Sequence, residues 1–317
     1  MRQKTLAEEG FEKYRKPTRR EQFLKDMEQV IPWRELCDAI EPFYPRPEGA
    51  GRRPVGIDRM LRIYFLQHWF NLSDPAAEEA LYDSRAMRQF VGIDLGREPA
   101  PDETTICKFR HLLERHNLGD RLFELINEYL QENGMKINTG TIVDATIITA
   151  PSSTRNKDKA RDPEMHQTRK GKQWYFGMKG HIGVDSRTKL IHSVVATAAN
   201  VHDSQVLGDL LHGGETRVWG DSAYAGQKDV IAEHAPQAKD FTNQKGRRNQ
   251  PLSETERLKN RTKSKVRAKG EHPFLVLKQI FGFNKVRYRG LDKNATRLFV
   301  ACGLVNIYLA RRQLLAA

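Results

Sequence analysis

The sequence predicts an all-α N-terminal region followed by a mixed α/β region whose sheet is flanked by helices. Residues 21–132 repeat apolar side chains at helical spacing. The run 141–148 is rich in β-branched and apolar residues, which is typical of a strand buried on both faces. Beyond it, short apolar runs are interspersed with helical segments, as in sheets whose strands are connected by helices. The length of 317 residues suits one large domain or two of ordinary size.

The N-terminal region is expected to start with a flexible arm over residues 1–20. This stretch is charged and lacks the apolar segment of a secretory signal. An amphipathic helix is predicted over 21–31, and the Pro- and Gly-rich stretch 43–54 is predicted to be a loop. The strongly apolar stretch 57–73 should form the central helix of this region. Its aromatic residues are expected to pack in the core rather than to stack on bases.

Residues 99–118 predict a turn and then a helix, capped near Asp102 or Thr104. Short helices joined by tight turns resemble a helix-turn-helix DNA reader. In that interpretation the exposed contacts are Thr104, Thr105, Lys108 and Arg110. A plain helical bundle that supports dimerisation explains the same pattern, so the sequence leaves both interpretations open.

The second region is expected to begin after Gly134 and Gly140. A buried strand at 141–148 is followed by a polar loop over 151–171 and by a hairpin with strands at 174–184 and 190–198. The later elements are a helix at 200–211, a strand at 218–220, a helix at 227–234, a short strand at 239–242, helical segments at 253–269 and 271–281, and a closing helix at 297–315. Pro273 should either break or kink the helical segments at 253–269 and 271–281 or lie in the first turn of the second of them.

Asp144 and Asp221 are carboxylates associated with predicted strands. Asp144 lies within the buried strand 141–148, where desolvating a charge costs several kcal/mol or more unless it is paired. A structural role, met by backbone donors or a nearby Arg, explains Asp144 alone equally well. Asp221 follows a short strand, at the kind of edge where α/β sheets place ligand and metal sites, although it would also serve as a helix cap.

A third carboxylate is predicted on a late helix. Arg267, Glu271 and Lys278 are spaced by four and by seven, so they project from one helical face. Such spacing also occurs on many solvated helices. Combined with the two strand-borne carboxylates, it favours three acidic groups converging on divalent cations, and oxygen ligands suit Mg²⁺ or Mn²⁺.

These residues resemble the DDE triad of insertion-sequence transposases. Asp144 stands in TIVDATII, Asp221 in VWGDSAYAG and Glu271 in RAKGEHPFLVLK, and the stretches 150–185 and 197–207 match as well. The similarity is greatest to the IS-five (InsH-like) group, whose members carry an N-terminal helical transposase domain. It extends from about residue 20 to the C-terminus. The Tyr-Arg-Glu-Lys pattern of the family is kept in part, because Ser264 stands at the Tyr position.

The resemblance implies an RNase H-like catalytic domain over 136–317 after a helical DNA-binding or assembly domain over 21–135. It implies two Mg²⁺ (or Mn²⁺) ions per active site, held by Asp144, Asp221 and Glu271. The implied activity is cleavage of the ends of the element and joining of their 3′-OH groups to target DNA. The implied partners are terminal inverted repeats, target DNA and a second copy in a homodimer, in the bacterial cytoplasm and at the nucleoid when DNA is bound. No membrane partner is expected.

The net charge of +13 arises from two segments of the chain. Residues 151–180 carry a net +5 and residues 239–270 a net +8, and both segments lie beside predicted metal ligands. A solvated face explains each run alone, but two runs beside one site favour a path for a polyanion. The DNA contacts predicted there are Arg155, Lys157, Arg169, Lys170, Lys172, Lys245, Arg247 and Arg248. Arg267 and Lys278 would hold phosphates beside the scissile bond.

Three other functions share some of these sequence features. An RNase H-like nuclease without strand transfer shares the site, and a catalytically silent, transposase-derived DNA-binding protein would follow from loss of a carboxylate, yet all three are present. A basic RNA-associated protein leaves the buried Asp144 unexplained.

Cys37, Cys107 and Cys302 are far apart in the sequence and are expected to be reduced. His181 and His202 are expected to have structural or supporting roles.

Overall fold

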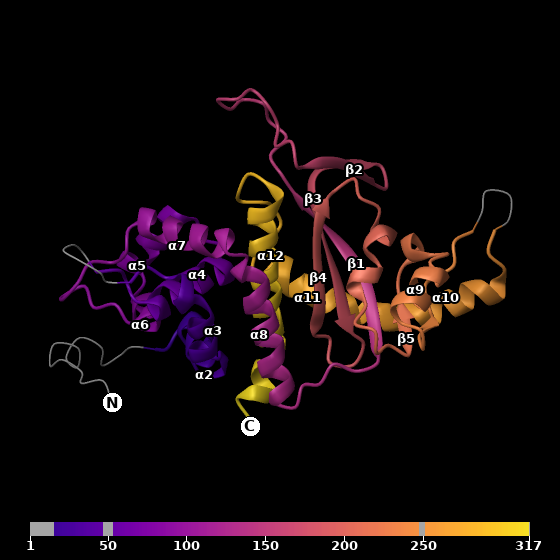
Figure 1. The fold of residues 1–317 in the computed structure, drawn as a ribbon, viewed down its shortest axis with the longest axis horizontal. Coiled ribbons are helices and arrows are strands. Elements are labelled where there is room, and N and C mark those ends of the chain that lie inside the picture. Colours follow the sequence, from indigo (N-terminus) through magenta and orange to yellow (C-terminus); the bar gives the residue numbers. More distant parts are fainter. Residues whose placement is uncertain (1–15, 47–52, 247–250, 317) are drawn as a thin grey trace.

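The computed structural model describes residues 16–46, 53–246 and 251–316, in which helices precede a mixed sheet as expected (Figure 1). The predicted arm is described from residue 16 onward. The N-terminal helices are α2 (Arg19–Val30), α3 (Trp33–Ile40), α4 (Ile57–Trp69), α5 (Asp74–Asp83), α6 (Arg85–Val91), α7 (Glu103–Arg115) and α8 (Leu118–Glu132), with a 3₁₀ turn η1 (Glu41–Phe43).

Sequence signals for the helix ends agree with the structure. Ser73 caps α5 and Asp102 caps α7, each accepting a hydrogen bond from a backbone N–H of the first turn. Helix α4 is buried on all sides from Met60 to Trp69, which confirms it as the centre of the helical region. Its aromatic residues pack against other rings, as between Phe65 and Trp69, whose centroids lie 5.8 Å apart.

A six-stranded mixed sheet forms the second region. Its strands are β1 (Gly140–Thr149), β2 (His166–Lys170), β3 (Gln173–Asp185), β4 (Ile191–Ala198), β5 (Arg217–Trp219) and β6 (Lys239–Asp240). The order is β2-β3-β1-β5-β6, and β4 pairs with β3. β3 is antiparallel to β1, β2 and β4, whereas β1, β5 and β6 are parallel. The predicted hairpin is therefore confirmed as β3 and β4.

The later helices follow the predicted order. They are a 3₁₀ turn η4 (Ser222–Tyr224), α9 (Lys228–His234), α10 (Glu254–Arg267), a 3₁₀ turn η5 (Ala268–Gly270), α11 (Glu271–Leu275), a π-helical turn η6 (Val276–Ile280) and α12 (Leu291–Leu314). Pro273 lies in the first turn of α11, where no intrahelical N–H is required of it.

Three predicted elements differ from the structure. The polar loop expected over 151–171 contains β2, whose exposed residues pair with β3. The helix expected over 200–211 is two 3₁₀ turns, η2 (Asp203–Val206) and η3 (Gly208–Leu210), separated by one residue. Helix α12 begins at Leu291, six residues before the predicted start, because Asn294 accepts hydrogen bonds from the N–H groups of Arg287 and Tyr288 and fixes the preceding turn.

Helix α12 joins the helical region to the sheet. It packs against α8 on one side and β4 on the other, and one hydrophobic cluster includes residues of both regions. The side-chain oxygen of the buried Asn306 accepts the N–H of Ile191, and its amide donates to Asn127 Oδ1 and to the Ile191 carbonyl, each at 2.7 Å. The domain boundary at residue 135 remains a proposal, since the core crosses it.

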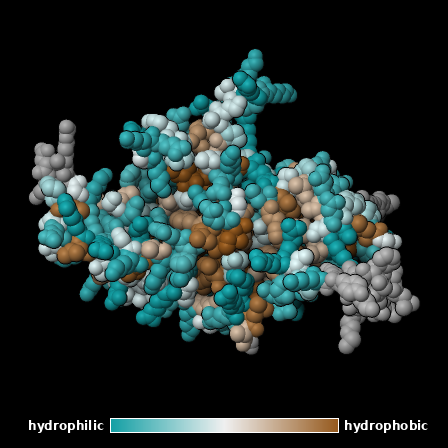
Figure 2. Space-filling view, turned by 180° about the vertical axis from the view of Figure 1, so that it is seen from behind, coloured by the Kyte–Doolittle hydropathy of each residue, from teal (hydrophilic) through white to brown (hydrophobic). Residues whose placement is uncertain are grey.

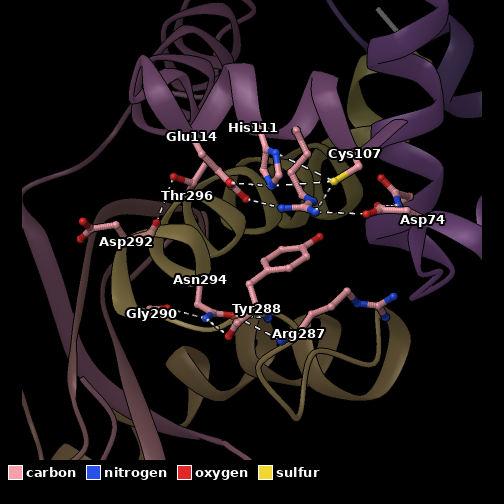
Figure 3. A network of polar contacts seen from close by, with 12 residues as sticks. Asp74, Cys107, His111, Glu114, Arg287, Tyr288, Gly290, Asp292, Asn294 and Thr296 are labelled. Carbon is pink, nitrogen blue, oxygen red and sulfur yellow. Dashed lines mark hydrogen bonds and ion pairs between the residues drawn. The ribbon is translucent and has the colours of Figure 1, made fainter. Parts of the chain in front are cut away.

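Arg110 corrects the helix-turn-helix prediction. It was expected to be an exposed DNA contact, but it is buried, 5% exposed. Its guanidinium donates to Glu114 at 2.8 Å and to Asp74 at 3.1 Å, and it lies 4.0 Å from the centroid of the Tyr288 ring. Figure 3 shows Tyr288 facing the helix that carries Glu114. This cation holds the helical region to the segment before α12 and is not available to DNA.

The other predicted contacts on α7 have different exposures. Thr104 and Lys108 are exposed, and Thr105 is half-buried. These three positions leave the base-reading and bundle interpretations open. Across the described ranges, no helix is both long and apolar enough to cross a membrane.

Candidate active site

Asp144 is presented by β1 as the sequence predicted. Its side chain is 17% exposed, and Oδ1 accepts the N–H of Ala145 at 2.9 Å. Ile142 and Val143, which precede it, are fully buried, and Ile182 pairs with it on β3. A strand held on both sides by neighbours gives this carboxylate a fixed position at the edge of the core.

Asp221 lies beside Asp144 because of the register of two parallel strands. β1 and β5 pair from Gly140↔Arg217 to Ile142↔Trp219, and each Asp lies two residues beyond the last pair. Asp221 Oδ1 accepts the N–H of Ala223 at 2.8 Å and so caps η4. The capping role proposed for Asp221 is thus present, at η4 rather than at the helix that follows.

Glu271 approaches the two Asp residues through Arg267. Arg267 Nη1 lies 3.2 Å from Asp144 Oδ2, and Nη2 lies 4.0 Å from Glu271 Oε1. The side chain of Glu271 is 65% exposed. Arg267 therefore links two of the three carboxylates, Asp144 and Glu271, with Glu271 on the solvent side of the guanidinium. Asp221 is brought close to Asp144 by the strand register.

The helix that carries Arg267 is positioned by close backbone contacts. A Cβ at Gly270 would lie 3.0 Å from Ile142 Cγ2, so the absence of a side chain lets η5 approach β1. Asn243 Nδ2 donates to Ser264 Oγ at 3.0 Å, and the Asn243 N–H donates to the carbonyl of Gly220. Ser264, where the family has Tyr, thus ties α10 to the end of β5.

Burial disfavours the ionised form of the Asp144 carboxylate. Desolvation, together with a smaller contribution from the nearby Asp221, raises the pKa of Asp144 to about 6. The N–H of Ala145, Arg267 and Lys170 lower the pKa but do not overcome burial. An additional cation at this point would favour the ionised carboxylate, which is the electrostatic condition of a metal site.

The donor set fits Mg²⁺ or Mn²⁺ in its chemistry. Asp144, Asp221 and Glu271 supply carboxylate oxygens, the ligands these ions prefer. Asp144 and Asp221 are adjacent, but the described part of the chain contains no group of three His, Cys, Asp or Glu residues gathered closely enough to hold an ion. Completing the set requires the exposed Glu271 side chain to turn past Arg267. The Glu271 side chain is 65% exposed and approaches Arg267 no closer than 4.0 Å, which leaves room for this rotation.

Two lysines border the carboxylates. Lys278 Nζ donates to the Ile147 carbonyl of β1 at 2.7 Å, so its ammonium is anchored beside the strand. Lys170 is exposed, and its charge lowers the pKa values of both Asp144 and Lys278, which places the end of β2 near the site. Lys170 therefore contributes positive charge near Asp144, and Lys278 holds a second ammonium against β1 at Ile147.

Five of the other predicted DNA contacts lie on the surface. Arg247 and Arg248 lie outside the described residues. The exposed ones are Arg155, Lys157, Arg169, Lys172 and Lys245. On the face seen in Figure 2, hydrophilic side chains prevail on the arm that projects at the top, which Figure 1 identifies as the segment before β2.

A cluster of polar residues around His181 includes Lys179, Asp203 and Tyr224, none of which the sequence analysis identified. Lys179 Nζ donates to Asp203 Oδ1 at 2.8 Å, and His181 Nδ1 lies 3.9 Å from the same oxygen. Tyr224 is fully buried, its hydroxyl has no hydrogen-bond partner in the described structure, and burial followed by Asp203, Asp144 and Asp221 raises its pKa. The sequence signal for this ion pair was Lys179 in GMKGH and Asp203 in VHDS, because each charge stands in an otherwise apolar segment.

The two histidines occupy supporting positions. His181 is buried on β3, and its Nε2 lies 2.8 Å from Thr197 Oγ1 on β4. Burial lowers the pKa of His181 to about 4. His202 precedes η2, and its Nδ1 accepts the N–H of Ser204.

The chain thus combines a helical region with a mixed sheet that brings two carboxylates together just beyond the last β1–β5 pair. Residues 136–307 match the family described as Transposase DDE domain, and residues 12–112 match the Transposase domain (DUF772). The chain therefore belongs to the DDE transposases, and the mixed sheet flanked by helices is the RNase H-like core expected of them. The narrower IS-five assignment stays a prediction.

One solved structure is similar over most of the chain. It is described as a cryo-EM structure of the piggyBac transposase synaptic complex with hairpin DNA. The identity is 7% and the TM-score 0.48, over 93% of this chain and 75% of that chain.

Proposed function

We propose that this transposase cleaves the ends of its insertion sequence and joins the resulting 3′-OH groups to target DNA, with Asp144, Asp221 and Glu271 as the divalent-cation ligands. The observation that carries the proposal is the adjacency of Asp144 and Asp221 at the end of the β1–β5 pairing, with Arg267 linking Asp144 to Glu271. Family membership supports DNA cleavage and joining, and the proposal adds the residues and the cations.

Bound cations would stabilise the entering and leaving oxygens of phosphoryl transfer, a chemistry that needs no covalent protein intermediate. The chain's own residues hold the groups in place. Asp144 is fixed by β1 and Asp221 by its hydrogen bond to Ala223. Arg267 lies beside Asp144, and Lys278 is anchored on β1 at Ile147. Both would bind phosphate oxygens of the strand being cut.

Glu271 is favoured over its acidic neighbours on α10. Glu256 Oε2 accepts hydrogen bonds from the N–H and hydroxyl of Ser253, completing a capping box at the start of the helix. Glu254 lies in the same first turn, where helix N-termini favour acidic residues. Glu271, by contrast, follows Arg267 by one turn and contacts it.

The test is incubation of the full chain with duplexes that carry the DNA ends of its own element, with and without Mg²⁺. Products are mapped at nucleotide resolution, and a target plasmid is included to detect joining. The proposal expects Mg²⁺-dependent cuts at the element ends and covalently joined products. Cuts without joining would assign a nuclease instead, and binding without cuts would assign a silent DNA-binding protein.

A further inference from the structure

Trp174 is the most exposed large apolar residue in the described ranges, with 64% of its surface accessible. The other three tryptophans pack against rings of the core, as Trp219 does on Phe241 at 5.5 Å between centroids. A single exposed apolar side chain is ordinary on a protein surface. The surroundings of Trp174 are what make it a candidate contact.

Cations surround Trp174 on the β2–β3 hairpin. Arg169 pairs with Trp174 across the two strands, and Lys170 pairs with Gln173, while Lys172 lies in the turn. All of these side chains are exposed, and the sequence has no acidic residue between His166 and Val184. An aromatic ring among unneutralised cations matches the pattern of surfaces on which bases stack while the phosphates are bound.

The hairpin end lies near the carboxylates. β3 pairs with β1 alongside Asp144, through Ile182, and continues beyond Gly177 as one strand of the hairpin. β3 is bent where Gly177 adopts a φ of +156°, and a Cβ there would come within 2.2 Å of the Ile148 carbonyl oxygen. Figure 1 shows β2 lying across the top of the sheet, where this bend directs it. DNA bound at Asp144 and extending along β3 would therefore reach this hairpin.

We propose that Trp174 stacks on an unpaired base of the DNA end bound at Asp144, and that Arg169, Lys170 and Lys172 bind the phosphates on either side of that base. This inference rests on the proposed function and adds a contact that opens the duplex beside the cut. Stacking of one base on an aromatic side chain corresponds to a change of about 5- to 150-fold in affinity. A second protein copy is a poorer occupant, because the cations would remain unpaired unless it were acidic.

The experiment uses the full chain and duplexes of the element end in which 2-aminopurine replaces one base at a time across the cut site. Fluorescence is read with Ca²⁺, which permits binding to be measured apart from cleavage, and cleavage is then measured with Mg²⁺. The variants are Trp174→Ala, Trp174→Phe and, as a matched control, Leu315→Ala. Leu315 is 40% exposed near the carboxyl terminus, which Figure 1 places at the opposite end of the molecule from β2.

The wild type and Leu315→Ala are expected to change the fluorescence of 2-aminopurine at one or two positions. Trp174→Ala should abolish this change and slow cleavage about 10-fold or more, while Trp174→Phe retains most of both because its ring still stacks. A mismatch that unpairs the same base in advance should restore much of the cleavage by Trp174→Ala, which a purely structural role of Trp174 would not produce.

Normal cleavage and an unchanged fluorescence response in Trp174→Ala would overturn this inference and leave the proposed function intact. Equal loss on mismatched and paired duplexes would also overturn it, by showing that the indole supports the fold or another step. If wild-type protein neither binds nor cleaves the duplexes, the proposed function fails, and the stacking inference fails with it.

Discussion

Arg267 stands between Asp144 and Glu271, 3.2 Å from the first carboxylate and 4.0 Å from the second. Its Nε is buried without a hydrogen-bond partner, although the side chain is 24% exposed. In the described structure the guanidinium neutralises part of the charge that a divalent cation would neutralise in the proposed complex. Arg267 and the cation therefore compete for Asp144, unless phosphate draws the guanidinium away.

Arg267→Ala should accordingly bind Mn²⁺ more tightly than the wild type in the absence of DNA, because a positive charge beside the site is removed. The same variant should cleave DNA at least about 10-fold more slowly, since a charge-assisted phosphate contact is lost. Binding is measured by titration of Mn²⁺ and cleavage in a single-turnover assay. Arg261→Ala, an exposed arginine of the same helix, is the control. Weaker Mn²⁺ binding by Arg267→Ala would show that Arg267 organises the carboxylates rather than competing with the ion.

The charges of the β2–β3 hairpin should appear in the salt dependence of DNA binding. If Lys170 and Lys172 each neutralise a phosphate, replacing both by Gln should lower the magnitude of the log–log salt slope by about 0.9 per contact. The slope is obtained from affinities over a series of salt concentrations. Arg312→Gln, an exposed cation near the carboxyl terminus, should keep the wild-type slope. An unchanged slope in the double variant would make the hairpin a solvated surface.

Much of the sheet could be predicted because its strands differ sharply from their surroundings. The run around Asp144 is apolar on both faces, and the β3–β4 hairpin has a clear turn between two apolar strands. Strand β2 was missed because its sequence, HQTRK, has no apolar alternation, and pairing with β3 alone makes it a strand. The expected helix over 200–211 became 3₁₀ turns, as the chain wraps closely around buried Leu207 and Leu210.

The site was predictable in its composition and less so in its geometry. Local sequence placed Asp144 on a strand, Asp221 after one, and Glu271 one turn after Arg267. It did not indicate that Arg267 contacts Asp144 or that Lys278 donates to the backbone of β1, because these contacts join segments more than 100 residues apart. The exposure assigned to Arg110 failed for the same reason: its partners Asp74 and Tyr288 are distant in sequence.

Arg110→Met should destabilise the protein by about 3–5 kcal/mol, because it removes a buried cation and leaves the half-buried carboxylates of Asp74 and Glu114 without their shared partner. The free energy of unfolding is measured by urea denaturation. Lys108→Met, on the same helix but exposed, should change stability by less than about 0.5 kcal/mol. A mild effect of Arg110→Met together with lost DNA binding would restore Arg110 as a DNA contact. Loss of binding in Lys108→Met alone would favour the base-reading interpretation of α7.

His68 should make the helical region sensitive to acid. It is 3% exposed, and burial, followed by Arg297 and Arg287, lowers its pKa well below the usual 6.5. The folded state therefore keeps His68 neutral, and the unfolded state takes up a proton as the pH falls below 6.5. Stability from this group is present above that pH and is lost on acidification, by up to about 1.4 kcal/mol per pH unit.

The measurement is the free energy of unfolding from pH 7.5 downward for the wild type and for His68→Gln. The difference between the two should shrink as the pH falls through the window below 6.5. His166→Gln, which removes an exposed imidazole, is the matched control. A constant difference between wild type and His68→Gln at all pH values would mean that His68 gains a proton in the folded protein as readily as in the unfolded one.

The most direct test of the proposed site is the rate of Mg²⁺-dependent end cleavage in Asp144→Asn, Asp221→Asn, Glu271→Gln and Glu256→Gln, each first shown to fold and to bind the element ends. Each Asn or Gln keeps the shape of the side chain and removes the charge that would hold the cation. The account predicts a loss of at least about 100-fold for the first three variants and wild-type cleavage for Glu256→Gln, whose carboxylate caps α10. Wild-type cleavage by Asp144→Asn or Asp221→Asn, or cleavage lost in Glu256→Gln and kept in Glu271→Gln, would contradict it.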